Sequence, residues 1–135
     1  MRAVDTNILM YAHDPRDARK QEIALALIES LTDGALLWQV ACEYLSASHK
    51  LAPFGYDRAS AWQDIRDMRF VWKTILPVWQ VQEIAEDLMR RYSLSFWDAM
   101  VIAACLAGGV ERLYSEDFDA YPSIDGLEVV NPFAS

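Results

Sequence analysis

Short apolar runs alternate with longer amphipathic segments along this chain. The short runs predict buried strands at 3–4, 35–38, 75–78, 110–114 and 127–130. The longer segments repeat apolar residues every three or four positions, which predicts helices at 6–13, 17–31, 39–51, 57–72, 81–92 and 95–108. Pro77 argues against the third strand, because proline has no N–H to donate to a neighbouring strand.

Strands separated by helices predict the fold class, which is α/β. Each strand–helix–strand unit implies a right-handed crossover between parallel strands. We therefore expect a central parallel sheet of four to five strands, flanked by helices on both faces. With 135 residues, 53% of them hydrophobic, the chain is expected to form a single domain over 1–135.

Charge and cysteine usage narrow the functional classes. Twelve basic and twenty acidic residues give a net charge of −8, which argues against nucleic-acid binding through bulk charge. A metal-dependent nuclease is not excluded, because its site requires clustered acids. Cys42 and Cys105 lie in apolar helical segments, so we expect buried, reduced thiols and a cytoplasmic protein. The longest uncharged run, 99–110, is too short to span a bilayer, so no membrane partner is expected.

The first candidate site is Asp5-Thr6-Asn7, directly after the first predicted strand. Ligand crevices of parallel α/β sheets lie at the carboxyl ends of the strands. A carboxylate, a hydroxyl and an amide there can bind a hard cation through oxygen atoms. Asp5 is equally a favoured cap for the helix that follows. From this stretch alone, both interpretations stand.

Three further acids share features with the first site. Glu43 lies at the border of the apolar stripe of a predicted helix. It could reach over the edge of the sheet, or it could be a solvated side chain with no specific role. Asp98 follows Ser95 by three residues, which is a helix-capping pattern, yet its large apolar neighbours place a charge near a buried surface. Asp117 follows the strand at 110–114, so it is expected on the same sheet edge as Asp5.

Together these acids predict a pocket for Mg²⁺ or Mn²⁺. Without a cation such a pocket is strained, since two unit charges about 4 Å apart repel by ~4 kcal/mol at an effective dielectric of about 20. Other chemistries lack their motifs: there is no phosphate-binding glycine loop, no GxSxG elbow and no HExxH around His13 or His49. A haloacid-dehalogenase-type phosphatase needs a second aspartate at the position of Asn7.

Four motifs, taken in order, resemble the PIN-domain ribonucleases, and in particular the VapC-like toxins of type II toxin–antitoxin pairs. The motifs run over nearly the whole chain and comprise residues 4–9 (VDTNIL), 41–45 (ACEYL), 96–104 (FWDAMVIAA) and 113–118 (LYSEDF).

The resemblance implies a set of site residues. Four acids would be catalytic, namely Asp5, Glu43, Asp98 and Asp117. Asp5, Asp98 and Asp117 would hold one or two Mg²⁺ or Mn²⁺ ions. The supporting residues would be Thr6, Asn7 and Ser115, and Asp119 is a fallback for the last acid.

The resemblance also implies the reaction and the partners. A metal-activated water would hydrolyse a phosphodiester bond of single-stranded or loop RNA while a carboxylate accepts its proton, leaving a 5′-phosphate and a 3′-hydroxyl. The partners would be the RNA substrate, a cognate antitoxin protein and a second copy of the chain in a homodimer. Trp62 and Trp72 would line a partner groove or a dimer face, or else belong to the core.

RNA binding by an acidic chain needs a local basic surface. Two groups of basic residues recur at helical spacing, namely Arg16, Arg19 and Lys20, and Arg66, Arg69 and Lys73. Each group is either a basic rim for RNA or an ordinary solvated helix face.

Two rival functions remain open. A catalytically inactive PIN-like binding module would keep the fold and its protein partner without cleaving RNA. The other rival is a metal-dependent phosphatase acting on small molecules. It is disfavoured because this sequence has neither the second aspartate nor a phosphate-cradling loop.

Overall fold

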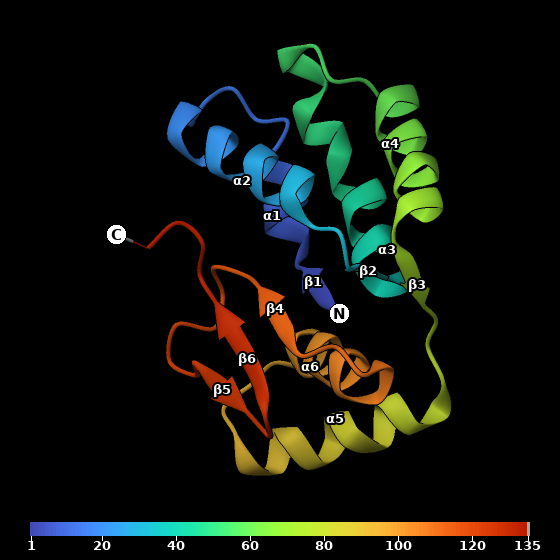
Figure 1. Ribbon diagram of the computed structural model, residues 1–135, viewed down its shortest axis with the longest axis vertical. Coiled ribbons are helices and arrows are strands. Elements are labelled where there is room, and N and C mark those ends of the chain that lie inside the picture. The colour runs from blue at the N-terminus through green and yellow to red at the C-terminus, as the bar shows by residue number, and fades with distance from the viewer. Residues whose placement is uncertain (135) are drawn as a thin grey trace.

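Six strands form one sheet in the order β3-β2-β1-β4-β6-β5 (Figure 1). In chain order they are β1 (Arg2–Val4), β2 (Gly34–Leu37), β3 (Lys73–Ile75), β4 (Arg112–Tyr114), β5 (Ser123–Ile124) and β6 (Leu127–Val130). Neighbouring strands pair in parallel except β5 and β6, which are antiparallel. This computed structural model describes residues 1–134.

Helices cover both faces of the sheet, so the predicted α/β class is confirmed. The helices are α1 (Thr6–Tyr11), α2 (Ala18–Ser30), α3 (Trp38–Ala47), the 3₁₀ helix η1 (Ser48–Phe54), α4 (Arg58–Val71), α5 (Trp79–Arg91) and α6 (Phe96–Gly108). The strands separate α1 to α4 from α5 and α6 (Figure 1). Within residues 1–134, no helix has the length and apolar character needed to cross a membrane.

Side-chain caps begin four of the helices, two of them at Asp5 and Ser95 as the sequence indicated. The carboxylates of Asp5, Asp17 and Asp57 and the hydroxyl of Ser95 accept hydrogen bonds from backbone N–H groups in the first turns. Gly109 ends α6 with a φ of 75°, a left-handed conformation that glycine adopts without steric cost.

Three predicted boundaries are wrong for local reasons. The strand predicted at 75–78 is β3, which ends at Ile75 because Pro77 cannot continue a ladder. Trp38, predicted in a strand, is the first residue of α3. The predicted helix 39–51 is α-helical only to Ala47 and continues as η1, which contains Pro53.

Strand β5 was not predicted, so the sheet has six strands where four to five were expected. It contains two residues, too few to show an alternating pattern. Asp125 and Gly126 join it to β6, and both have positive φ angles, 50° and 90°. This geometry is typical of a tight hairpin turn.

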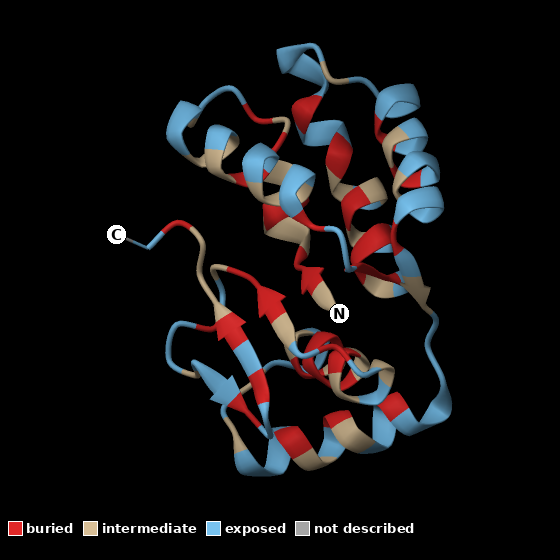
Figure 2. Ribbon diagram, viewed as in Figure 1, coloured by how far each residue is buried: buried red, intermediate tan, exposed pale blue. Residues whose placement is uncertain are grey.

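The core lies between the sheet and both helical layers (Figure 2). Trp72 is 6% exposed and packs on β2 at Gly34, where an added Cβ would lie 2.4 Å from the indole ring. Trp72 is therefore a core residue, whereas Trp62 is 44% exposed. Cys105 is buried as predicted, but the prediction for Cys42 is wrong. Cys42 is exposed because α3 turns Val40, Ala41 and Tyr44 toward the core instead.

Candidate active site

Asp5 lies where β1 ends and α1 begins, at the carboxyl edge of the sheet. Its N–H donates to the carbonyl of Tyr114 at 2.9 Å, which continues the pairing of β1 with β4. One carboxylate oxygen accepts from Thr6 N–H at 2.8 Å, and the other from the Ser115 hydroxyl at 2.7 Å. With 5% exposure, Asp5 is a buried acid fixed by β4, by the residue after β4 and by the start of α1. The capping interpretation of Asp5 is therefore confirmed, and it leaves the carboxylate in the site.

The charges of Asp117 and Glu43 act on the carboxylate of Asp5. Burial raises the pKa of Asp5 to about 6, and the negative charges of Asp117 and Glu43 contribute to this rise. The hydrogen bonds from Ser115 and Thr6 act in the opposite direction and lower its pKa. The sheet thus brings acids from β1, α3 and the segment after β4 within electrostatic reach of one another.

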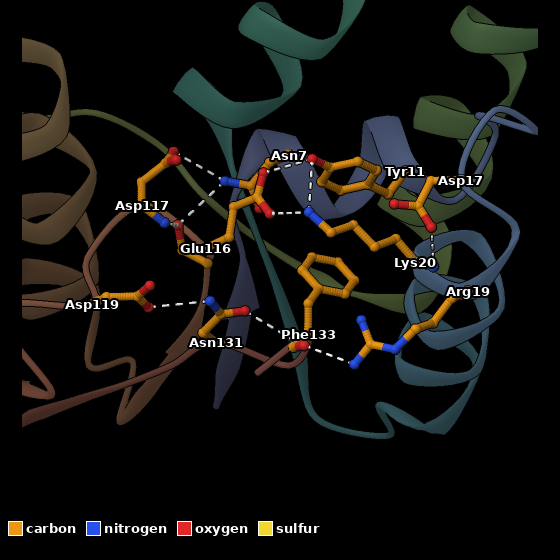
Figure 3. Close-up of polar contacts among 11 residues, drawn as sticks. Asn7, Tyr11, Asp17, Arg19, Lys20, Glu116, Asp117, Asp119, Asn131 and Phe133 are labelled. Carbon is orange, nitrogen blue, oxygen red and sulfur yellow. Dashed lines mark hydrogen bonds and ion pairs between the residues drawn. The ribbon is translucent and has the colours of Figure 1, made fainter. Parts of the chain in front are cut away.

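Asn7 connects α1 to the segment after β4 (Figure 3). Its Nδ2 donates to Asp117 Oδ2 at 3.0 Å and to Ser115 Oγ at 3.3 Å. Ser115 Oγ also accepts from the backbone N–H of Asp117 at 3.1 Å. Ser115 and Asn7 therefore both contact Asp117, Asn7 at the carboxylate and Ser115 at the backbone N–H.

Asp98 and Asp117 lie near each other although they come from different elements. Burial raises the pKa of Asp117, and repulsion from Asp98, Glu116 and Asp119 raises it further, against the effect of the Asn7 hydrogen bond. Asp98 is half-buried in the first turn of α6, where its N–H donates to Ser95 Oγ at 3.3 Å. The capping pattern is real, and it places the Asp98 carboxylate at the acid cluster.

Glu43 is held at both of its carboxylate oxygens. The Thr6 hydroxyl donates to Oε2 at 2.7 Å, and Gln39 Nε2 donates to Oε1 at 2.7 Å. Gln39 Nε2 also donates to the carbonyl of Trp97 at 3.1 Å, so one amide joins α3 to the start of α6. Sequence reasoning missed Gln39, although its spacing of four residues from Glu43 puts both on one side of α3.

Asp119 faces away from this cluster. It accepts a hydrogen bond from Asn131 Nδ2 at 3.1 Å (Figure 3). Glu116, on the other side of Asp117 in the chain, accepts from Tyr11 at 2.8 Å and from Lys20 at 2.9 Å. Of the three acids after β4, Asp117 is the one that contacts Asn7, the residue two positions after Asp5.

The residues of the site suit a hard divalent cation. In residues 1–134, no three His, Cys, Asp or Glu side chains stand close enough together to hold a metal ion as they are. All the available donors are nevertheless oxygens, and Oδ1 of Asn7 is buried without a hydrogen-bond partner. Asp117 accepts a hydrogen bond from Asn7 at Oδ2, and its carboxylate keeps lone pairs that a cation could use. Positive charge there would relieve the repulsion that raises the pKa values.

The two predicted basic groups differ in their surroundings. The first group is engaged within the molecule: Arg16 pairs with Asp14, Lys20 with Glu116, and Arg19 donates to the carbonyl of Phe133. The second group lies at the surface on α4 and β3, and within residues 1–134 it makes no salt bridge or side-chain hydrogen bond. Its members are Arg66, Arg69 and Lys73.

The fold and the site together define an α/β domain with acidic, oxygen-rich side chains at the carboxyl edge of a parallel sheet. The sequence model of the PIN domain matches residues 2–126. This chain therefore belongs to the PIN domain family, and the predicted family resemblance is confirmed. No curated protein matches the sequence significantly.

Three solved structures share this fold. A toxin–antitoxin complex from Klebsiella pneumoniae has a TM-score of 0.71 and 20% identity, covering 98% of each chain. VapC20 from Mycobacterium tuberculosis, a toxin that cleaves the sarcin-ricin loop, has a TM-score of 0.69 and 21% identity, covering 92% of this chain and 97% of its own. VapBC2 from Rickettsia felis, bound to a promoter DNA fragment, has a TM-score of 0.68 and 14% identity, covering 96% of this chain and 97% of its own.

Proposed function

We propose that this protein is a metal-dependent endoribonuclease and the toxin of a toxin–antitoxin pair. The observation that carries the proposal is the buried Asp5, whose pKa is raised to about 6 by burial and by the charges of Asp117 and Glu43. A fold that places acids against one another without a basic partner favours a cation as the missing charge. Family membership supports nuclease chemistry for that cation.

The four acids divide into two roles. Asp5, Asp98 and Asp117 would hold Mg²⁺ or Mn²⁺, which, when bound, supplies charge stabilisation at the phosphate and acidifies water. Glu43 would accept the proton of the attacking water, because Thr6 and Gln39 hold both of its oxygens and each oxygen keeps a lone pair. Ser115 and Asn7 would keep Asp5 and Asp117 at their positions. The attack itself proceeds in line at phosphorus.

Substrate and partners are proposed from the related structures. The VapC20 structure is that of a toxin that cleaves the sarcin-ricin loop, and the Klebsiella structure is a toxin–antitoxin complex. The first supports RNA as the substrate, and the second supports an antitoxin as a protein partner. We also propose a homodimer, since large apolar side chains are exposed, Phe70 by 90% and Trp79 by 81% among them. Two free cysteines suit the cytoplasm.

The test is cleavage of an RNA that contains loops, with Mg²⁺, with Mn²⁺ and with EDTA, by the wild type and by Asp98→Asn. The proposal predicts metal-dependent cleavage that leaves 5′-phosphate ends, and a loss of at least about 100-fold in rate for the variant, since its acid would bind the cation. Cleavage that persists in EDTA contradicts it. No cleavage of any RNA would favour the binding module, and hydrolysis of small phosphoesters alone would favour the phosphatase.

A further inference from the structure

Two adjoining hollows lead away from the acid cluster along α3. The first, of about 460 Å³, contains Glu43 in its wall together with Trp38, Gln39, Cys42, Ser46 and Trp97. The second, of about 700 Å³, lies between α3, α4 and the ends of β2 and β3. Trp38 and Cys42 line both hollows, so the two are neighbours, and together we call them the α3–α4 groove. Each hollow has a volume in the range of ligand-binding clefts.

The charge of the groove is opposite to that of the whole protein. Arg66 and Arg69 of α4 line its far end, and within residues 1–134 neither makes a salt bridge or a side-chain hydrogen bond. Other arginines of the chain bind carboxylates, as Arg2 does with Asp33 at 2.9 Å. Of the twenty acidic residues, Glu43 alone lines the two hollows. The groove is therefore a local cationic site in a chain of net charge −8.

Three indole rings line the α3–α4 groove. Trp97 is 62% exposed, Trp38 50% and Trp62 44%, which is unusual for such large apolar side chains. The guanidinium of Arg66 lies 5.9 Å from the ring centroid of Trp62, so a flat aromatic surface and a positive charge occur side by side. Aromatic faces bind nucleic-acid bases by stacking, and unpaired arginines bind phosphates.

We propose that the α3–α4 groove binds the single-stranded RNA segment that adjoins the scissile phosphate. Bases stack on Trp38 and Trp62, and Arg66 and Arg69 pair with two backbone phosphates. A cationic groove lined by aromatic rings is the combination that binds single strands without reading their sequence. The inference rests on the proposed function, because the groove starts at the proposed proton acceptor, Glu43.

The test measures binding separately from cleavage. A fluorescein-labelled single-stranded RNA of about twelve nucleotides is titrated in EDTA at several salt concentrations. Replacing both arginines, as Arg66→Gln with Arg69→Gln, is expected to weaken binding about tenfold or more. It should also reduce the slope of log K against log salt by about 1.4, since each lost phosphate contact on a single strand contributes about 0.7. Trp62→Ala should weaken binding with the salt slope unchanged, and Trp62→Phe should restore it.

The control is Arg58→Gln, which removes the same charge from the first residue of α4, outside the groove. It should leave both the affinity and the salt slope unchanged. The inference is overturned if the Arg66→Gln/Arg69→Gln protein binds RNA as the wild type does. It is also overturned if that protein loses only a dimer in sedimentation, because the groove is then a protein interface. If the wild type cleaves RNA and the Arg66→Gln/Arg69→Gln protein cleaves it equally well, the groove proposal is overturned and the proposed function stands. If the wild type binds RNA through the groove but cleaves none, the proposed function is overturned and the groove proposal stands.

Discussion

Asp5 lowers the stability of the fold when it is ionised, yet the proposed function needs it ionised to bind a cation. Its carboxylate is buried, and its pKa of about 6 lies above the ordinary value of 3.8. A group whose pKa is raised on folding stabilises the protein fully below its unfolded pKa, and this contribution disappears as the pH rises through the folded pKa. In the absence of metal, ionised Asp5 therefore weakens the fold above about pH 6.

The first prediction concerns Asp5→Asn without metal. Relative to wild type, the free energy of unfolding of the variant should increase between pH 4 and pH 7.5 by up to about 3 kcal/mol, at about 1.4 kcal/mol for each pH unit between the two pKa values. Urea unfolding in EDTA at the two pH values measures this difference, in which the titrating groups that do not interact with Asp5 cancel. A difference that is the same at both pH values would contradict the account of Asp5. With Mn²⁺, only the wild type should gain stability.

Gln39 gives the second prediction. Gln39→Leu removes the amide that joins Glu43 to the carbonyl of Trp97, so Glu43 is held by Thr6 alone. RNA cleavage should fall about 10- to 100-fold, as is typical when a group that orients a functional side chain is lost. Stability should fall by only about 1 kcal/mol, the usual contribution of one hydrogen bond.

The chain contains a matched control for Gln39. Gln63 donates to Asp67 at 2.9 Å, also four residues along a helix, but it lies on α4 and is exposed. Gln63→Leu should leave the cleavage rate unchanged. Equal activities of the two variants would show that Gln39 has no role in positioning Glu43.

At the residue scale, the sequence predicts the identity of the acids better than their contacts. Asp5 and Asp117 could be placed on one sheet edge because each follows a strand. From the sequence, the preference for Asp117 over Asp119 rests on the family resemblance alone, because the contacts that distinguish them come from Asn7 and Asn131, which are distant in the chain from the acids they contact.

At the element scale, β2 depends on a close contact with the end of α4. Gly34 leaves no room for a side chain, since an added Cβ would lie 2.4 Å from the ring of Trp72. Gly34→Ala is therefore expected to destabilise the protein by about 1–3 kcal/mol, the usual cost of overpacking. Chemical denaturation measures the loss.

A double-mutant cycle tests the cause of that loss. Trp72→Leu alone is expected to cost several kcal/mol, because Trp72 is buried and its removal leaves a cavity. In Gly34→Ala/Trp72→Leu the added methyl group has room, so the double variant should lose less than the sum of the two single losses. Additive losses would mean that the contact with Trp72 is not the reason for glycine at this position.

The elements themselves were predictable to different degrees. Helices α2, α4, α5 and α6 follow from apolar periodicity, and caps such as Asp57 and Ser95 mark where two of them begin. Strands of two or three residues carry no periodicity, so β5 was missed and β3 misplaced. The strand order, which brings α3 and α6 to the same edge as Asp5, depends on long-range pairing that no local pattern specifies.

At the scale of the whole molecule, acidic and basic surfaces serve different parts of one proposed reaction. In that reaction the acids at the end of β1, on α3, on α6 and after β4 would bind a cation, and the α3–α4 groove would supply the positive charge that RNA needs. A net charge of −8 is then compatible with a nuclease, because RNA contacts a local cationic surface. The account depends on the identity of the acids that bind the cation.

The most direct test of the account is the rate of RNA cleavage as Mg²⁺ is titrated, for Asp117→Asn and Asp119→Asn. These substitutions remove the same charge two residues apart, but only Asp117 contacts Asn7, whereas Asp119 contacts Asn131. The account predicts near wild-type cleavage by Asp119→Asn. It predicts a loss of at least about 100-fold by Asp117→Asn, with a higher Mg²⁺ requirement. Equal loss in both variants, or cleavage by Asp117→Asn at the wild-type rate and Mg²⁺ concentration, would contradict it.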